Sequence, residues 1–509
     1  MHLTHQDLQQ LESRGIGRDE IERQLELFRD PPPPVDIDRP CLAGDGILRL
    51  DDERRQRLAT LFDQAAGEGR FSRFVPASGA ATRMFKELFQ CDGALRQWER
   101  DGACPDHPFH QTFFANLRRF AFYPQLATAM REGGLNPDSL LEQRMMRPFL
   151  DALLTDAGLD YGRTPKGLID FHHDGRQART PVEEHLAEAV ALLADGCTST
   201  RVHFTVSPEW QDAFARVAET ARESIRRASG IEVEVDFSCQ NPATDTIAVT
   251  MENEPVRDDN GRLVLRPAGH GALLGNLEGM NADLVLIKNI DNVVPAHLQP
   301  DVVRWWKVLG GLLVELEARI KGYLRALDDG LTDALAKEAA GFLTETFGYA
   351  PPACSDVDGL KSWLTERLDR PLRVCGMVEN RGEPGGGPFW TRSETGVSRQ
   401  IVEMAQLDTK QPQTQKLLRQ ATHFNPVFMA CALKDATGRP HRLGRYVDES
   451  AVIITEKSLA GRPIKALERP GLWNGAMAGW NTLFVEIPAA VFQPVKTVND
   501  LLRPGHQPG

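Results

Sequence analysis

The sequence predicts an α/β protein whose central sheet is mostly parallel. In the middle of the chain, short apolar runs rich in β-branched residues alternate with longer stretches of helical periodicity, which is typical of strand–helix–strand units. With 509 residues, of which 41% are hydrophobic, the chain is long enough for about two to four compact units. The strand-like runs are 201–206, 232–237, 246–250 and 284–287, and the helix-like stretches are 182–193, 209–227 and 272–277.

The composition changes along the rest of the chain. The first part has helical periodicity, and the proline run 31–34 ends a helix there because proline has no N–H to donate. Glycine, proline and tryptophan become frequent in the last part, where short strands are expected. The predicted parts are a helical segment 1–68, an α/β core 69–350 and a mixed portion 351–509 that completes the core, with helical insertions in the core at about 90–160 and 300–346.

The chain is acidic overall. It has 59 Lys and Arg against 71 Asp and Glu, which gives a formal net charge of −12 at pH 7. Such a chain has no overall field to attract nucleic acid or an anionic membrane surface, so neither is expected as a partner. Any anionic ligand must be held by a few locally placed cations. The oligomeric state stays open.

Cysteine usage and hydropathy indicate a cytoplasmic protein with reduced thiols. The eight cysteines are scattered and form no C-x-x-C clip, which argues against a zinc ribbon or a dense disulfide framework. No run of about 18 apolar residues is present, and the first residues lack the apolar region of a secretion signal.

A loop of small residues lies between a predicted strand at 71–75 and a predicted helix at 84–89. Small side chains let backbone N–H groups approach an anion, and the following helix N-terminus favours negative charge. Arg83 and Lys86 add two cations to this loop. The spacing is not that of a Walker loop, and a tight strand-to-helix turn is the alternative interpretation.

Two further segments carry charged residues next to turns. Lys166 lies in a Pro-Lys-Gly turn, where a lysine is usually solvated. Asp291 follows directly after the apolar run 284–287 and is flanked by Asn289 and Asn292. The carboxyl ends of parallel strands are where α/β proteins bind ligands, and an Asp with Asn neighbours suits Mg²⁺ better than zinc. An Asx-type turn is the alternative.

The last part of the chain is rich in Asn, Glu and Trp beside glycine turns. This combination offers hydrogen-bond donors, acceptors and apolar ring faces together, which favours a hydroxyl-rich ligand. Each segment alone could be a turn or a core tryptophan. The segments lie around Glu403, Asn425, Glu468, Trp473 and Lys496.

The order of these segments resembles that of the sugar-nucleotide pyrophosphorylases that act on glucose-1-phosphate or N-acetylglucosamine-1-phosphate. The loop Ser-Gly-Ala-Ala-Thr-Arg at 78–83 resembles the Gly-Gly-x-Gly-Thr-Arg loop of that family, with Ser78 and Ala81 in place of two glycines. More narrowly, VPASGAATRMFK, KNIDNVVP, EPGGGPFW and GLWNGAMAGWNT resemble the bacterial DUF4301 family. The other matching segments are Pro-Lys at 165–166, Phe-x-x-Gln at 237–240, Pro-Ala-Gly-His-Gly at 267–271, Asn-Ile-Asp-Asn at 289–292, Leu-Glu at 467–468 and Phe-x-Pro-Val-Lys-Thr-x-x-Asp-Leu at 492–501.

The pyrophosphorylase resemblance implies a three-layer α/β/α core of the GT-A nucleotidyltransferase type. It also implies a Mg²⁺-dependent reaction of a nucleoside triphosphate, UTP or another, with a sugar-1-phosphate. The segment before Pro165 is longer than the usual gap in that family. By the resemblance, Arg83, Lys166 and Lys496 are catalytic, Ser78, Gly79, Ala80, Ala81, Thr82, Lys86, Gln240 and Gly269 bind the nucleotide, His270, Glu403, Asn425 and Glu468 face the sugar or its phosphate, and Asp291 holds the metal.

Two other functions remain open. A GT-A glycosyltransferase would use a nucleotide-sugar, but such enzymes typically carry an Asp-x-Asp metal motif, whereas this chain has Asn-Ile-Asp-Asn. A non-catalytic nucleotide- or sugar-binding protein is compatible with the altered glycine loop. One fold supports many chemistries, so the function rests on the site residues.

Overall fold

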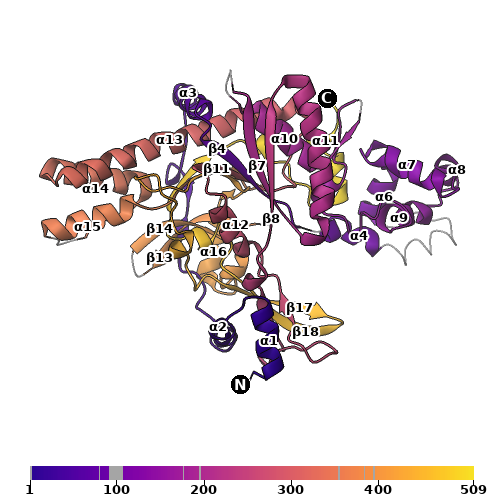
Figure 1. The fold of residues 1–509 in the computed structure, drawn as a ribbon, viewed down its shortest axis with the longest axis horizontal. Helices are drawn as coiled ribbons and strands as arrows, with labels where there is room; N and C mark the ends of the chain where they lie inside the picture. The colour runs from indigo at the N-terminus through magenta and orange to yellow at the C-terminus, as the bar shows by residue number, and fades with distance from the viewer. Residues whose placement is uncertain are drawn as a thin grey trace. The chain divides into compact units, whose positions relative to one another are not determined.

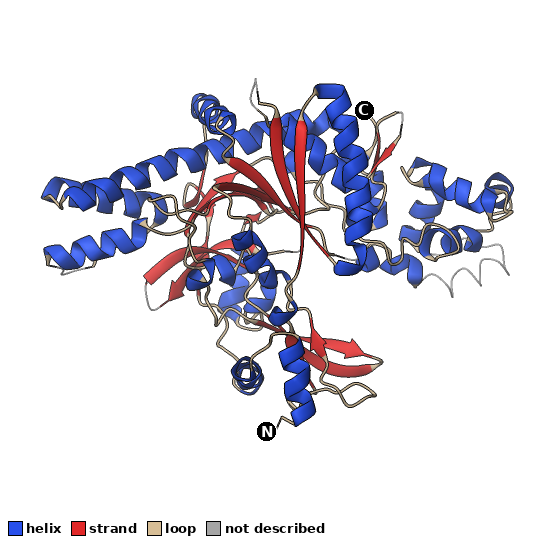
Figure 2. Cartoon of the chain, viewed as in Figure 1, coloured by secondary structure: helices blue, strands red, loops and turns tan. Residues whose placement is uncertain are grey.

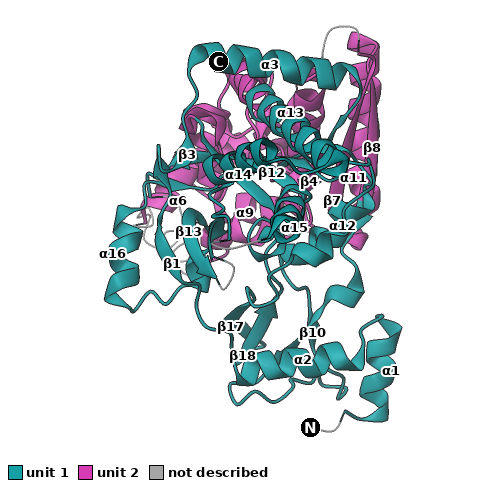
Figure 3. Cartoon of the chain, turned by 90° about the vertical axis from the view of Figure 1, so that its left-hand side faces the viewer, with its two compact units in different colours: residues 1–72, 238–287, 307–487 teal, residues 73–237, 288–306, 488–509 magenta. Residues whose placement is uncertain are grey.

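The chain is a mixed α/β protein with a mostly parallel central sheet, as the sequence predicts (Figures 1 and 2). It divides into two compact units, each made of three separate segments of the chain (Figure 3). Unit 1 comprises 1–72, 238–287 and 307–487, and unit 2 comprises 73–237, 288–306 and 488–509. The computed structural model describes residues 3–79, 81–90, 107–175, 177–193, 197–352, 356–382, 385–393 and 396–509.

Unit 2 is built on two parallel neighbouring strands, β4 (Phe71–Pro76) and β7 (Ser199–Val206), with β8 (Glu232–Cys239) next to β7. Helix α10 (Pro181–Ala191) begins with a capping box in which Thr180 and Glu183 satisfy each other's backbone N–H groups. The other elements are α4 (Lys86–Phe89), α6 (Pro108–Ala115), α7 (Tyr123–Glu132), α8 (Pro137–Glu142), α9 (Arg147–Leu154), β5 (His172–His173), β6 (Ala178–Arg179) and α11 (Gln211–Ser229).

In unit 1, strand β12 (Leu372–Glu379) is buried over almost its whole length. It pairs in parallel with β19 (Asn481–Glu486) and antiparallel with β16 (Phe428–Ala432). The strands follow the order β2 (Leu42–Ala43), β3 (Gly46–Leu48), β19, β12, β16, β11 (Leu284–Lys288), and β15 (His423–Phe424) also pairs with β12. The helices of unit 1 are α3 (Asp52–Gly67), α12 (Leu274–Gly279), α14 (Asp333–Phe347), α15 (Val357–Leu368), α16 (Pro412–Gln420) and, from residue 307 onward, α13 (Gln299–Asp329).

Two smaller sheets complete unit 1. An antiparallel four-stranded sheet packs on helices α1 (His5–Ser13) and α2 (Arg18–Arg29), whose apolar side chains share a core with those of its strands. The four strands are β10 (Leu265–Arg266), β9 (Thr246–Val249), β18 (Arg462–Glu468) and β17 (Ile453–Leu459), and the second sheet is β1 (Ile37–Pro40), β13 (Gly387–Ser393) and β14 (Gly396–Val402).

The strand-like runs predicted in the middle of the chain are β7, β8, β9 and β11, and the helix-like stretches there are α10, α11 and α12. The short strands β1–β3 have no counterpart among the predicted elements, because runs of two to four residues carry too little periodicity to be detected. Within the described ranges, no helix is long and apolar enough to cross a membrane.

Candidate functional site

The small-residue loop of unit 2 begins where β4 ends. Its backbone is held by the neighbouring strand and turn: the Ala77 N–H donates to the Thr205 carbonyl (2.8 Å), and the Lys166 N–H donates to the Gly79 carbonyl (3.4 Å). The Ser207 hydroxyl donates to the Ser78 carbonyl (3.3 Å). A single 3₁₀ turn, Ala81–Arg83, follows. The predicted position Ala80 lies outside the described residues.

The polar side chains that follow in the loop point into solvent. Thr82, Arg83 and Lys86 are all exposed. Among the described residues, neither Arg83 nor Lys86 has a carboxylate within ion-pair distance. Both cations therefore keep their charge available to an anionic ligand.

Two predicted catalytic lysines meet the predicted metal ligand. The Nζ atom of Lys166 lies 2.7 Å from Oδ2 of Asp291, and the Nζ atom of Lys496 lies 3.4 Å from the same oxygen. Lys166 also donates to the Val495 carbonyl (2.6 Å). The side chains of Lys166 and Asp291 are 12% and 10% exposed, whereas that of Lys496 is 55% exposed. Lys166 is thus fixed, and Lys496 reaches water.

The two lysines set the charge state of Asp291. Burial acts to raise the pKa of the Asp291 carboxyl, but the positive charges of Lys166 and Lys496 outweigh it, so the net pKa is lowered. The carboxylate is therefore ionised at neutral pH.

Backbone hydrogen bonds connect the segments that carry these groups. The Ile290 N–H donates to the Pro76 carbonyl (3.3 Å), the Val495 N–H to the Asp291 carbonyl (3.1 Å) and the Val498 N–H to the Met84 carbonyl (3.1 Å). The loop, the Asp291 turn and the C-terminal segment are therefore one connected structure inside unit 2.

A buried carboxylate fixes the strand ends from which two of these segments leave. Glu188 of α10 accepts from Arg73 of β4 (2.6 Å) and from Lys288 at the end of β11 (2.7 Å), and the indole N–H of Trp306 donates to it as well (2.7 Å). Burial acts to raise the pKa of Glu188, but Lys288 and Arg73 outweigh it and the net pKa is lowered. Glu188 is thus a buried anion that ties the two strands together.

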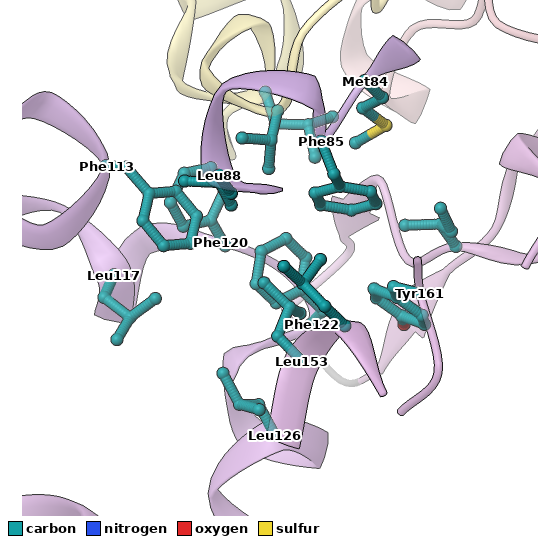
Figure 4. Packing of buried hydrophobic residues seen from close by; sticks show 14 of the residues in the cluster. Met84, Phe85, Leu88, Phe113, Leu117, Phe120, Phe122, Leu126, Leu153 and Tyr161 are labelled. Atoms are coloured by element: carbon teal, nitrogen blue, oxygen red, sulfur yellow. The ribbon is translucent and has the colours of Figure 1, made fainter. Parts of the chain in front are cut away.

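An aromatic core supports the loop and the C-terminal segment. Met84 and Phe85, which follow Arg83, pack with aromatic residues of the helical insertion, including Phe120 and Phe122 (Figure 4). The rings of Phe120 and Phe122 are stacked with their centroids 4.9 Å apart. Val495, Val498 and Leu501 on either side of Lys496, together with Val293, Phe113 and Tyr161, belong to the same cluster.

The C-terminal segment is also held by a histidine pair. Nδ1 of His506 lies 2.8 Å from Nε2 of His172, and Nδ1 of His172 lies 3.0 Å from Glu184. Burial, with a smaller contribution from His172, lowers the pKa of His506 to about 3. His506 is therefore neutral at pH 7, and its contact with His172 anchors the segment through a directional hydrogen bond.

The donors around Asp291 bear on the predicted Mg²⁺. In the part of the chain that the structure describes, no group of three or more His, Cys, Asp or Glu side chains could hold a metal ion. Mg²⁺ is commonly held by one or two carboxylates together with substrate phosphates and water. Asp291 alone fits that arrangement only when a bound phosphate supplies further oxygens.

Unit 1 brings together predicted residues of the sugar side. The Leu472 N–H donates to Nδ1 of His270 (2.9 Å), so the ring proton is on Nε2, which faces Glu403 at 3.5 Å. The hydrogen bond from His270 lowers the pKa of Glu403. The indole of Trp473 stacks on the imidazole, with centroids 4.0 Å apart and an angle of 14°. The result is an ionised carboxylate beside a fixed aromatic pair.

Two glycines allow the loops of this group to approach each other. A Cβ atom at Gly271 would lie 2.1 Å from the Pro470 carbonyl oxygen, and one at Gly471 would lie 2.6 Å from Cε1 of His270. Only glycine fits at either position without a backbone or ring shift.

The remaining predicted residues of unit 1 lie on the same loops or next to them. Asn425 donates its backbone N–H to the Gly386 carbonyl (2.8 Å), and a Cβ at Gly386 would lie 3.3 Å from Cγ of Glu403. A Cβ at Gly269 would lie 2.9 Å from Oε2 of Glu468.

Gln240 donates to Thr244 (3.3 Å), whose carbonyl accepts from Arg469 (2.9 Å). Arg469 directly follows Glu468 in the chain. Gln240 is therefore connected, through Thr244, to the segment that carries Glu468.

Several contributing groups were not predicted from the sequence. Trp473 was singled out only as a possible ring face, and its stacking partner was not identified. The Val495 carbonyl carries no side-chain signal at all. Glu188 could have been suspected as an acidic residue in a predicted helix beside apolar neighbours, but its partners are at least 100 residues away in sequence.

Comparison with known proteins supports the fold. The structure is similar to the crystal structure of the UDP-N-acetylglucosamine pyrophosphorylase from Trypanosoma brucei, with 13% sequence identity, a TM-score of 0.50, and coverage of 99% of this chain and 80% of that one. It also matches the UDP-glucose pyrophosphorylase from Leishmania major, with 12% identity, a TM-score of 0.44, and coverage of 98% and 79%. No curated protein matches the chain.

The family is established by sequence. Residues 4–507 match the family described as a domain of unknown function, DUF4301. The match covers nearly the whole chain and includes every predicted site residue. The chain therefore belongs to the DUF4301 family.

Proposed function

We propose that this protein is a nucleotidyltransferase that joins a nucleoside triphosphate, with UTP as the first candidate, to a sugar-1-phosphate and releases pyrophosphate. The observation that carries the proposal is the meeting of Lys166 and Lys496 at Asp291, beside a small-residue loop that carries Arg83 and Lys86. These four cations lie in one compact unit of a chain whose net charge is −12. They are positioned to hold several phosphate groups.

The proposed reaction needs positioning and charge stabilisation more than proton transfer. An oxygen of the sugar-1-phosphate attacks the α-phosphorus of the triphosphate, a new P–O bond forms, and the bond to the β-phosphate oxygen breaks. Nucleophile and leaving group are both phosphates, so no general base is required. Lys496 and Arg83 hold phosphate oxygens, Arg83 through two N–H groups and Lys496 as a point charge.

Lys166 has a different part in the proposal. Its ammonium is already oriented by Asp291 and the Val495 carbonyl, so it presents a fixed positive charge next to the loop. A fixed charge does not need to reorganise when negative charge shifts during the reaction.

Mg²⁺ is part of the proposal, with Asp291 as its protein ligand and phosphate oxygens as the others. When bound, the metal would neutralise phosphate charge at the reacting centre.

The sugar is proposed to bind the unit 1 group. Ionised Glu403 accepts hydrogen bonds from hydroxyl groups, and the fixed Nε2–H of His270 keeps that carboxylate charged. Asn425 and Glu468 add polar groups on the adjoining loops, and Gln240 with Gly269 is proposed to meet the base. The proposal includes a three-layer core of the GT-A type and a cytoplasmic location, where nucleoside triphosphates are available.

The test is exchange of radiolabelled pyrophosphate into nucleoside triphosphate in the presence of a nucleotide-sugar. A panel of UDP-, ADP-, GDP-, CDP- and dTDP-sugars covers the open choice of base and sugar. We expect exchange with at least one member, and a loss of at least 100-fold in Lys496→Ala. The exposed Lys337 of α14 provides the matched control, and Lys337→Ala should exchange like the wild type.

Absence of exchange across the whole panel, with folded protein and Mg²⁺ present, would refute the proposal. A glycosyltransferase would also give no exchange but would consume a nucleotide-sugar without pyrophosphate. A binding protein would be stabilised by a ligand of the panel without turnover.

A further inference from the structure

A buried arginine lies in the centre of unit 1 without a counter-ion. Arg373 of β12 is 0% exposed, and no carboxylate of the described residues lies within ion-pair distance of it. Its Nε donates to Oγ1 of Thr482 (2.8 Å) and its Nη1 donates to the Trp473 carbonyl (2.6 Å). Its Nη2 has no hydrogen-bond partner among the described residues.

Burial of this kind is unfavourable for folding. A guanidinium removed from water loses its hydration, and only an opposite charge or a full set of acceptors restores that loss. Arg373 has two acceptors for its five N–H donors and no opposite charge. Burial accordingly lowers the pKa of Arg373. Arg373 therefore contributes little to stability by its burial, and its distinctive contacts are the two groups to which it donates.

Arg373 connects the central sheet to the turn that carries the aromatic pair. On one side it is anchored by Thr482, which lies opposite it in the register of β12 and β19. On the other side it holds the carbonyl of Trp473, the residue whose ring stacks on His270. The neighbouring Leu472 N–H sets the tautomer of that imidazole.

The turn is closed internally by backbone hydrogen bonds, in which the Asn474 and Ala476 N–H groups donate to the Gly471 carbonyl (2.9 and 3.1 Å). Asn474 is 2% exposed, and its Oδ1 has no hydrogen-bond partner among the described residues. Its amide nitrogen lies 3.5 Å from Oε1 of Gln406, and its side chain also hydrogen-bonds Glu403. The 2.6 Å bond from Arg373 adds a short, charge-assisted contact that links the turn to strand β12 of the sheet.

We propose that Arg373 is a positioning residue for the sugar-phosphate side of the site. It acts through the Trp473 carbonyl, which sets where the indole stacks on His270 and so where the Nε2–H meets Glu403. The inference rests on the proposed function, because the ligand whose binding it affects is the sugar-1-phosphate. Arg373 touches neither substrate.

The experiment compares Arg373→Met with Val374→Ala in the full chain. Methionine keeps a long apolar stem and removes the guanidinium. Val374 is also 0% exposed and is next to Arg373 in β12, but successive strand residues face opposite sides of the sheet. Val374→Ala therefore destabilises the same strand without releasing the Trp473 carbonyl.

The kinetic readout is the KM for each substrate, measured well below both melting temperatures. Arg373→Met should raise the KM for the sugar-1-phosphate at least tenfold and leave that for the triphosphate within twofold. Val374→Ala should leave both within twofold. A sugar-1-phosphate KM within twofold of wild type in Arg373→Met, or an equal rise for both substrates, would overturn the inference.

A second readout needs no activity and separates this inference from the proposed function. The chain contains eight tryptophans, and 5-fluorotryptophan labelling gives each a ¹⁹F NMR signal, with Trp473 assigned from Trp473→Phe. The Trp473 signal should shift or broaden in Arg373→Met and stay unchanged in Val374→Ala. An unchanged signal in Arg373→Met would overturn the inference whether or not the enzyme turns over.

Discussion

Replacing Asp291 by asparagine removes the carboxylate that two lysines share, and the structure predicts how the two lysines respond. Lys166 keeps only the Val495 carbonyl as an acceptor, because no second carboxylate of the described residues pairs with it. Lys166→Met leaves Asp291 with Lys496 at 3.4 Å. The loss of Asp291 should therefore cost more stability than the loss of Lys166.

The size of the effect follows from distance and burial. At 2.7 Å and an effective dielectric constant of about 20, the attraction between Lys166 and Asp291 is about 6 kcal/mol before desolvation is subtracted. Removing one partner of a buried pair costs about 3–5 kcal/mol. The lower end applies here, because about one tenth of each side chain reaches water. We expect about 3 kcal/mol for Asp291→Asn and about 2 kcal/mol for Lys166→Met.

The assay is a double-mutant cycle measured by urea unfolding at pH 7. The double variant has no unpaired buried charge, so it should cost about 3 kcal/mol rather than the sum of the two single effects, which leaves a coupling energy of about 2 kcal/mol. The coupling should persist in 0.5 M salt, because buried pairs are weakly screened. Additive single effects, within about 0.5 kcal/mol, would refute the reasoning, and so would a larger cost for Lys166→Met than for Asp291→Asn.

Three further predictions concern stability, packing and loop approach. Burial and the charge of Glu183 raise the pKa of Asp170 from 3.8 to about 7, so the folded state binds the proton more tightly and this group lowers stability as the pH rises from 3.8 to about 7. Asp170→Asn should therefore raise the free energy of unfolding at pH 8, by at most about 4 kcal/mol. A gain over wild type that does not shrink by pH 5 would contradict this. Phe122→Ala should lower the free energy of unfolding in urea by about 3–5 kcal/mol, because the ring is 0% exposed. Phe89→Ala should lower it by about 0.5 kcal/mol or less, because that ring is 49% exposed. Equal losses in the two variants would show that the aromatic core is not packed as described. Gly471→Ala should weaken the stabilisation by sugar-1-phosphate in a thermal-shift titration, because its Cβ would displace His270. Gly275→Ala lies in α12 with open space around it and should leave that stabilisation unchanged. The same titration curve for both variants would argue against the loop geometry.

Much of the fold could be predicted because its signals are local. The strands β7, β8, β9 and β11 are apolar runs in the sequence, and α10 begins at a Thr-Pro-x-Glu capping pattern. The neighbourhood of Lys166, Asp291 and Lys496 was predicted only through the resemblance to the pyrophosphorylases. No periodicity in this chain indicates that residues 125 and 205 positions apart share one oxygen atom.

The features that escaped prediction are those made by long-range packing. Arg373 is an isolated arginine in a strand, and local patterns place such a residue at the surface. Its partner carbonyl lies 100 residues further along the chain. The helical insertion was predicted from its aromatic and helical pattern, but not its contact with Val495 and Val498. Contacts of this kind depend on how distant segments pack.

The segment 488–509 also determines when unit 2 can be finished during synthesis. The Lys166 ammonium donates to the Val495 carbonyl, which is synthesised 329 residues later in the chain. At about 5–20 residues per second, the delay on the ribosome is roughly 15–65 s. During that time the aromatic cluster lacks Val495, Val498 and Leu501 and leaves apolar surface uncovered. The nascent chain therefore passes through a long-lived, incompletely packed state, in which chaperone capture or aggregation competes with completion of the unit.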